Sequence, residues 1–460
     1  MHISRNLIIG ELQEISVIKM NSRIWPLIVA MVLGMSTFAA SVETDRNWYL
    51  AGEAMKVRVT ADDAMIAYAE LCDTRGLAAG VMVSLNRGKG TGIIELPSNL
   101  HSGYYVLSVY TRDNANVYQR LVAVVNPLRK SVDDDIEWVQ IASPDSLSYP
   151  ESEDSSPNLQ SFNSSIFQSF NSSARPKAVC YQRDARILNA REIEGHIINA
   201  RVKNVYEGKT FRDSDIRPSM SIIGKQIHYF EGEMVNDSIA VFYTYGIHGR
   251  LPIVLSAISS TGESLPIEVI SPFAALLPKE LPHLVFHYQR SEVEARSLAM
   301  QRHQMAIAHT NDMTEGGENM AVGVPLDYDD TAFSTKPDLS YNLDEYRQFL
   351  TIREVLLEYV ICVEKKKVNG VQKLLVRIEP DHYDNILPSL VLIDGMPVFD
   401  IERLLNYDAR RIHYINIYGG QYTFGHDIYN GILSFVTRSG QLTNYPIERN
   451  MQYLVYDFPE

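Results

Sequence analysis

The side chains best suited to metal chemistry lie in two short acidic segments. Asp381-His382-Tyr383-Asp384 offers three metal-ligating side chains in four residues, and Asp327-Tyr328-Asp329-Asp330 gathers three carboxylates. The first segment follows Pro380 and is typical of a solvated polar turn. The second lacks the regularly spaced acidic residues and glycine of a calcium-binding loop. We therefore expect no metal at either segment.

Residues for covalent or acid–base catalysis are not arranged in any recognisable motif. The pairs His283/His287 and His303/His309 have no suitable neighbours in the sequence, and the second pair does not have helical spacing for one metal. No Gly-x-Ser-x-Gly elbow, phosphate-binding glycine loop or His-Glu-x-x-His helix is present. We predict a non-enzymatic protein with no catalytic residues and no cofactor. One enzymatic hypothesis stays open: a periplasmic hydrolase whose catalytic residues are distant in sequence and come together only in the folded protein.

Composition limits the partners and the size. The chain has 460 residues and a net charge of −14, which argues against a nucleic-acid partner because such proteins need a basic face. The three cysteines, Cys72, Cys180 and Cys362, are widely spaced and form no metal-binding pair. One disulfide among them is left open.

The amino-terminal region has the pattern of a secretory signal peptide. After Met20, a short basic stretch ends at Arg23, an apolar stretch covers Ile24–Met35, and small residues cover Thr37–Ser41. The apolar stretch is too short to span a bilayer. We expect a signal peptide at residues 20–41, with Met1 and Met20 both open as the start. The mature protein would be exported to the periplasm.

Residues 42–127 predict a first β-sandwich. Short runs, such as the alternating Met55–Val59 and the β-rich Tyr104–Tyr110, are separated by turn residues, a spacing typical of immunoglobulin-like sandwiches. The sequence Tyr49-Leu-Ala-Gly-Glu53, followed by Tyr68-Ala-Glu-Leu71 and Leu96–Tyr105, resembles macroglobulin-like domains. That resemblance implies a structural or interaction fold.

The remaining elements extend the prediction to a mostly β protein with a smaller α/β part. Residues 128–177 are rich in serine, asparagine and proline and predict a flexible linker. Residues 178–286 contain runs that alternate or are continuously apolar, and they predict a second sandwich of the immunoglobulin-like or transthyretin-like kind. A helix over Ser291–His309 and an acidic loop would make the connection at 287–342. Leu343–Tyr359 is the clearest amphipathic helix, with Phe349, Ile352, Val355, Leu356 and Tyr359 on one stripe.

The segment Leu387–Gly440 carries the most specific pattern. An apolar run is followed by Asp394-Gly395, the strongest short hairpin signal, and a second strand begins after it with Pro397 and Val398. Two β-rich runs follow, Ile412–Tyr418 and Gly431–Thr437. This order resembles the plug domain of TonB-dependent outer-membrane receptors. The fold class expected is thus two immunoglobulin-like β-sandwiches followed by a plug-like α/β domain at 343–445, with a tail at 446–460.

The resemblance implies a role in the outer membrane of a Bacteroidota-like bacterium. A receptor plug sits inside a barrel of at least about eight strands, whereas only twenty residues follow Gly440. We expect a plug-like domain without its own pore, associated peripherally with the outer membrane, that docks to or occludes a separate barrel protein. The plug subunit of a type IX secretion translocon is the specific expectation.

The residues expected to meet that partner lie between the two β-rich runs. Aromatic side chains often anchor interfaces, so Tyr418, Tyr422 and Phe424 are predicted as partner-binding, and capping of the sheet edge is the other interpretation. Asp394 and Gly395 are predicted as a structural turn. A ligand- or glycan-binding accessory module of an uptake system is the alternative function, although the chain has few tryptophans for stacking sugars.

Overall fold

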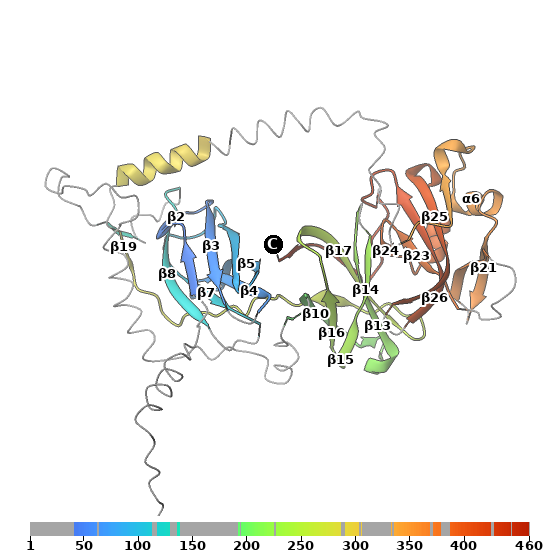
Figure 1. Ribbon diagram of the computed structural model, residues 1–460, viewed down its shortest axis with the longest axis horizontal. Coiled ribbons are helices and arrows are strands. Elements are labelled where there is room, and N and C mark those ends of the chain that lie inside the picture. Colours follow the sequence, from blue (N-terminus) through green and yellow to red (C-terminus); the bar gives the residue numbers. More distant parts are fainter. Residues whose placement is uncertain are drawn as a thin grey trace, which may run out of the picture. The chain divides into compact units, whose positions relative to one another are not determined.

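The computed structural model describes most of the chain after residue 40 (Figure 1). The residues outside the description are 1–40, 62–63, 113–116, 129–135, 139–191, 194, 225–226, 287–289, 303–304, 306–332, 334, 369–370, 379–386, 425–426, 443 and 460. Several predicted features therefore lie outside the described residues: the signal peptide up to residue 40, most of the linker, Cys180 and both acidic segments considered as metal sites. Where it is described, the chain is mostly β and forms several sheets.

The first module is a sandwich of a three-stranded and a five-stranded sheet, in the orders β1-β3-β6 and β2-β8-β7-β4-β5. Its strands are β1 Ser41–Thr44, β2 Trp48–Leu50, β3 Ala54–Thr60, β4 Ile66–Cys72, β5 Leu77–Ser84, β6 Lys89–Glu95, β7 Gly103–Tyr110 and β8 Tyr118–Val125. Alternating residues face inward, as Met55, Val57 and Val59 do on β3, because successive side chains of a strand point to opposite faces. The predicted first sandwich agrees with this architecture.

The second module pairs two four-stranded sheets, in the orders β15-β16-β10-β18 and β14-β13-β17-β27. Its elements are β10 His196–Val202, η2 Asp213–Asp215, β13 Ile216–Ile222, β14 His228–Glu231, β15 Glu233–Asn236, β16 Ile239–Thr244, β17 Gly249–Ser259, β18 Ile267–Val269 and β27 Gln452–Phe458, with a small hairpin of β11 Val205–Tyr206 and β12 Lys209–Thr210. The expected tail at 446–460 contains β27, which pairs antiparallel with β17 from Gly249↔Phe458 to Leu255↔Gln452. The second sandwich is thus completed by a strand that follows the C-terminal module.

The C-terminal module is built on the five-stranded sheet β20-β25-β26-β23-β24. Its elements are β20 Leu339–Asn342, η4 Leu343–Glu345, α6 Ile352–Glu358, β21 Val363–Val368, β22 Val371–Val376, β23 Leu390–Ile393, β24 Met396–Pro397, α7 Ile401–Leu405, η5 Ala409–Arg411, β25 Ile412–Phe424 and β26 Asp427–Thr437. Ile415, Ile417 and Phe435 are fully buried on the face that packs with α6 and α7. The other face of the sheet packs with Ile227 and Tyr229 of the second module.

The long helix expected over Leu343–Tyr359 is wrong in its first half. Only a 3-10 turn forms at Leu343–Glu345, and α6 begins after Thr351, whose side chain accepts from the backbone of Glu354 while the Glu354 side chain accepts from that of Thr351. This capping box starts a helix locally and so separates it from the preceding residues. The strands that follow, β21 and β22, form a separate two-stranded sheet.

The segment between the second and C-terminal modules returns to the first sandwich. β19 (Leu284–Phe286) pairs in parallel with β9 (Ile136–Trp138), which lies inside the predicted linker. A helix over residues 290–302 follows, in agreement with the predicted helix as far as it is described. No helix in the described part of the chain is long and apolar enough to cross a membrane.

Candidate interaction sites

The turn at Asp394-Gly395 is built into the core of its module. The two residues have φ values of 46° and 93°, as a type I′ hairpin turn requires, and they join β23 to β24. The Asp394 carboxylate is buried and accepts from the backbone and hydroxyl of Thr437, at 2.7 and 2.5 Å, and from the backbone of Leu442 at 2.6 Å. Burial raises the pKa of Asp394, and these hydrogen bonds reduce the rise. Asp394 therefore ties the turn to the end of β26.

Tyr418, Tyr422 and Phe424 all lie on β25 rather than in a loop. The sheet carries on through the expected turn because a bulge between Tyr418 and Gln421 lets the strand pair with β26 as far as Phe424. Tyr418 is fully buried, so a partner would not reach its ring. Tyr422 and Phe424 are half-buried.

The aromatic side of this hairpin contacts the second module. The Phe424 ring lies 5.2 Å from that of Tyr229 on β14. Asp427, at the start of β26, forms a 3.2 Å ion pair with Arg217 and donates its backbone N–H to Glu231. Intramolecular packing therefore accounts for part of the aromatic surface that the sequence suggested as an interface.

A second surface of the C-terminal module was missed in the sequence. Leu357 on α6 is 75% exposed, and Leu350 and Ile361, which come before and after the helix, are 64% and 86% exposed. The signal was present, because a helix with apolar residues on both sides is not simply amphipathic.

Two polar contacts fix the segment after β18 and the helix 290–302 to the first sandwich. The Glu70 carboxylate, with no exposed surface, accepts from Ala275 at 3.0 Å, from Leu276 at 2.6 Å and from the Tyr110 hydroxyl at 2.9 Å. Burial raises the pKa of Glu70, and these hydrogen bonds reduce the rise. Ala275 has a φ of 53°, so successive N–H groups converge on the carboxylate as in an anion-binding nest.

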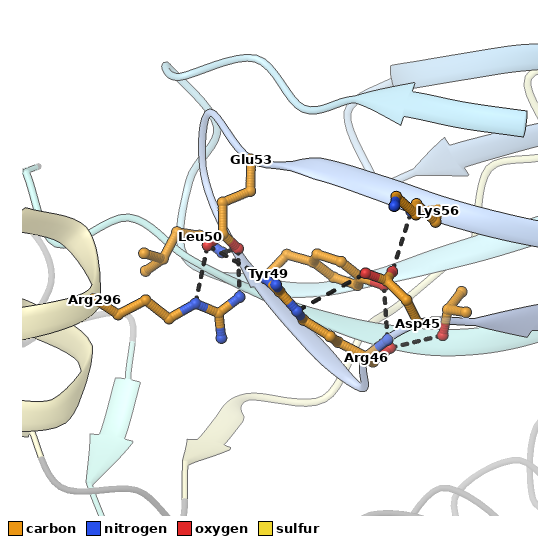
Figure 2. A network of polar contacts seen from close by, with 8 residues as sticks. Asp45, Arg46, Tyr49, Leu50, Glu53, Lys56 and Arg296 are labelled. Carbon is orange, nitrogen blue, oxygen red and sulfur yellow. Dashed lines mark hydrogen bonds and ion pairs between the residues drawn. The ribbon is translucent and has the colours of Figure 1, made fainter. Parts of the chain in front are cut away.

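Figure 2 shows the contact made by the helix. The Arg296 guanidinium donates to both carboxylate oxygens of Glu53, at 2.9 and 2.7 Å, and lies 4.2 Å from the centre of the Trp48 ring. Glu53 also accepts from the backbone of Leu50 at 2.9 Å, which holds its side chain in place. A bidentate, partly buried pair of this kind orients the helix on the sandwich.

A charged network joins the first and second sandwiches. Glu192 is buried and forms a 3.1 Å ion pair with Arg112, and it contacts His196 Nδ1 at 2.8 Å. The Tyr68 hydroxyl donates to Glu192 at 2.8 Å, and Tyr456 on β27 contacts His196 Nε2 at 2.7 Å. Burial raises the pKa of Glu192, but the contacts with His196 and Arg112 outweigh it and hold the pKa below its ordinary value.

A cleft of about 390 Å³ lies beside the turn after β4 and the start of β7. Its lining includes Arg75, His101, Tyr104, Tyr105 and His283. The Arg75 charge is satisfied locally by Asp73. Within the described residues, no three histidine, cysteine, aspartate or glutamate side chains are grouped to hold a metal ion.

Comparison with known proteins gives only remote likenesses. No family model and no curated protein matches the chain. Among solved structures, a BSP domain of a biofilm-associated protein is 9% identical with a TM-score of 0.16, over 52% of this chain and 30% of that one. Escherichia coli alpha-2-macroglobulin activated by porcine elastase is 10% identical with a TM-score of 0.17, over 52% and 20%. The native conformation of E. coli alpha-2-macroglobulin is 11% identical with a TM-score of 0.18, over 52% of this chain and 14% of that one. This chain thus spans less than a third of each of these structures.

Proposed function

We propose that this protein is a non-enzymatic, exported envelope protein whose C-terminal module docks to or occludes a separate outer-membrane barrel, from the periplasmic side. In this proposal the two sandwiches are macroglobulin-like, and they carry a plug-like C-terminal domain. A plug subunit of a type IX secretion translocon is the specific form of the proposal.

The observation that carries the proposal is the order of motifs in residues 387–440. The Asp394-Gly395 turn, the strand Ile412–Phe424 and the strand Asp427–Thr437 follow one another as in receptor plugs, and they lie in one sheet. The buried contacts of Asp394 support a rigid turn, which a domain that fits into a pore would need. The contacts of Glu70, Glu192 and Arg296 would hold the two preceding modules rigid, so that they could carry the C-terminal module.

Affinity purification from detergent-solubilised outer membranes tests the proposal. The immobilised protein should recover a large barrel protein, and Tyr422→Ala should weaken the recovery because it removes a half-buried aromatic side chain from the hairpin. Tyr245→Ala is the matched control, since Tyr245 is 79% exposed on the second module. Recovery of soluble partners alone would refute docking to a barrel. An unchanged melting temperature of Tyr422→Ala is needed to separate lost binding from lost folding.

The cleft beside Arg75 supports a second candidate function, a ligand- or glycan-binding accessory module. Its volume of about 390 Å³ falls within the range of small-molecule sites. Its lining by Arg75, His101 and His283 suits a polar ligand. Calorimetry against oligosaccharides separates the candidates: heat that is lost in His283→Ala would favour the accessory module, since His283 is exposed.

A further inference from the structure

The cleft beside Arg75 is formed by two parts of the chain that are far apart in the sequence. One wall is the turn after β4 together with residues 101–105 at the start of β7, and the other wall is the segment 281–284 that leads into β19. The walls are held together by packing, because Leu284 and Tyr104 are both buried in one apolar cluster. The cleft is therefore a fixed feature of the first sandwich and the segment that returns to it.

Asp73 is the only carboxylate among the described residues that line the cleft, and both of its oxygens are already used. Oδ1 accepts from the backbone N–H groups of Arg75 and Gly76, at 2.7 and 3.0 Å. Oδ2 accepts from Nε of the Arg75 guanidinium at 2.8 Å and also from its Nη2. Burial raises the pKa of Asp73, but these hydrogen bonds outweigh it and hold the pKa below its ordinary value. Asp73 therefore stays ionised, and its four acceptor positions are filled.

The other polar side chains that line the cleft can donate hydrogen bonds. A guanidinium has five N–H groups; Asp73 takes two from Arg75, whose side chain is 55% exposed. The Ser102 hydroxyl accepts from the backbone N–H of Asn126 and keeps its own proton to donate. His283 is exposed and supplies an imidazole from the opposite wall. Donors from both walls thus surround a space whose described carboxylate has no acceptor left.

We propose that this cleft binds the anionic group, a carboxylate or a sulfate, of an acidic oligosaccharide. The planar guanidinium of Arg75, held in one orientation by Asp73, can donate to an anionic group, and hydrogen bonds to charged groups are stronger than those to neutral ones. The volume of about 390 Å³ leaves room for the sugar ring that carries the group. The inference rests on the ligand-binding candidate function and names its substrate class.

Calorimetry with matched sugars tests the proposal. The ligands are trigalacturonate, its methyl ester, and a sulfated disaccharide from carrageenan. The methyl ester should bind about tenfold or more weakly than the better of the two acidic sugars, because it keeps the sugar and removes the charge. Tighter binding of trigalacturonate assigns the site to a carboxylate, and tighter binding of the sulfated sugar assigns it to a sulfate. Either should weaken at high salt, which screens exposed charges.

Two variants and a control locate the binding. Arg75→Met should weaken binding of the acidic sugar by about tenfold or more, because it removes the charged donor. It also leaves Asp73 without its partner, so His283→Ala is the second variant: it leaves that turn intact and should weaken binding by about fivefold. Arg58→Met is the matched control, since Arg58 is a 71% exposed arginine of the same sandwich that pairs with Glu43, and it should bind as the wild type does.

The possible failures have different meanings. Equal binding of trigalacturonate and its methyl ester would overturn the acidic specificity and leave the ligand-binding function standing. Binding of the acidic sugars that neither Arg75→Met nor His283→Ala weakens would remove the site from this cleft and overturn the proposal. An absence of heat with every sugar would overturn both the specificity and the ligand-binding function. None of these results bears on docking to a barrel, which the purification from membranes tests.

Discussion

Replacing Glu70 should uncouple the first sandwich from the chain that follows the second. In Glu70→Leu, the backbone N–H groups of Ala275 and Leu276 and the hydroxyl of Tyr110 lose the acceptor that they share. These groups are buried or half-buried against the sandwich, so water does not fully replace the carboxylate. The change therefore leaves several donors without a partner.

The magnitude follows from the number of donors. Each buried donor left unsatisfied costs about 1–3 kcal/mol. Three donors lose their acceptor, and relaxation of the segment around Ala275 lowers the summed cost. We expect the free energy of unfolding to fall by about 3–6 kcal/mol in Glu70→Leu. Glu70→Gln should cost less, because the amide keeps the volume and one acceptor oxygen.

Urea denaturation followed by circular dichroism measures this loss. Glu95→Leu is the control, since Glu95 is an exposed carboxylate on β6 of the same sandwich. A second measurement, limited proteolysis, should show faster cleavage near Ala275 in Glu70→Leu alone. If Glu70→Leu and Glu95→Leu unfold at the same urea concentration, the carboxylate does not hold the segment and the reasoning is wrong.

Three further changes test other contacts. Gly395→Val should lower stability by at least about 1–3 kcal/mol, seen as a lower melting temperature, because its Cβ would lie 2.7 Å from the Ile222 carbonyl oxygen at a positive φ. Glu192→Gln should cost about 3–5 kcal/mol near neutral pH. Since the folded pKa of Glu192 is lowered, the stability it contributes is present above about pH 4.5 and lost as the pH falls through the folded value, so urea titrations of the wild type and variant should converge in acid. Arg296→Lys should speed hydrogen exchange in its helix, because lysine cannot bind both oxygens of Glu53; unchanged exchange would contradict that role.

Local patterns predicted the strands well. The run Tyr104–Tyr110 is rich in β-forming residues and bounded by turn residues, and it corresponds to β7 at Gly103–Tyr110. Asp394-Gly395 likewise predicts its turn from two adjacent residues, because both adopt the positive φ that a type I′ turn needs. Such signals are readable because the backbone preference and the burial pattern reside in neighbouring residues.

Features that depend on distant residues could not be read in this way. Nothing near Gln452–Phe458 indicates that its partner is β17, because pairing between strands is decided by the fold. The sequence around β25 also gives no sign that Tyr229 packs on Phe424, because the two residues are far apart in the chain. Likewise, the role of Glu70 depends on a loop some 200 residues later.

The pairing of β17 with β27 determines the order in which the chain can fold. As the chain is synthesised from its amino end, β17 is made roughly 200 residues before the strand that completes its sheet. The C-terminal module is, in topology, an insertion into the second sandwich, and it can form its own core first. Until β27 arrives, the edge of β17 is open to pairing with other chains. Closing so long a loop is slow, so the second sandwich should be the last module to mature and the one most dependent on chaperones.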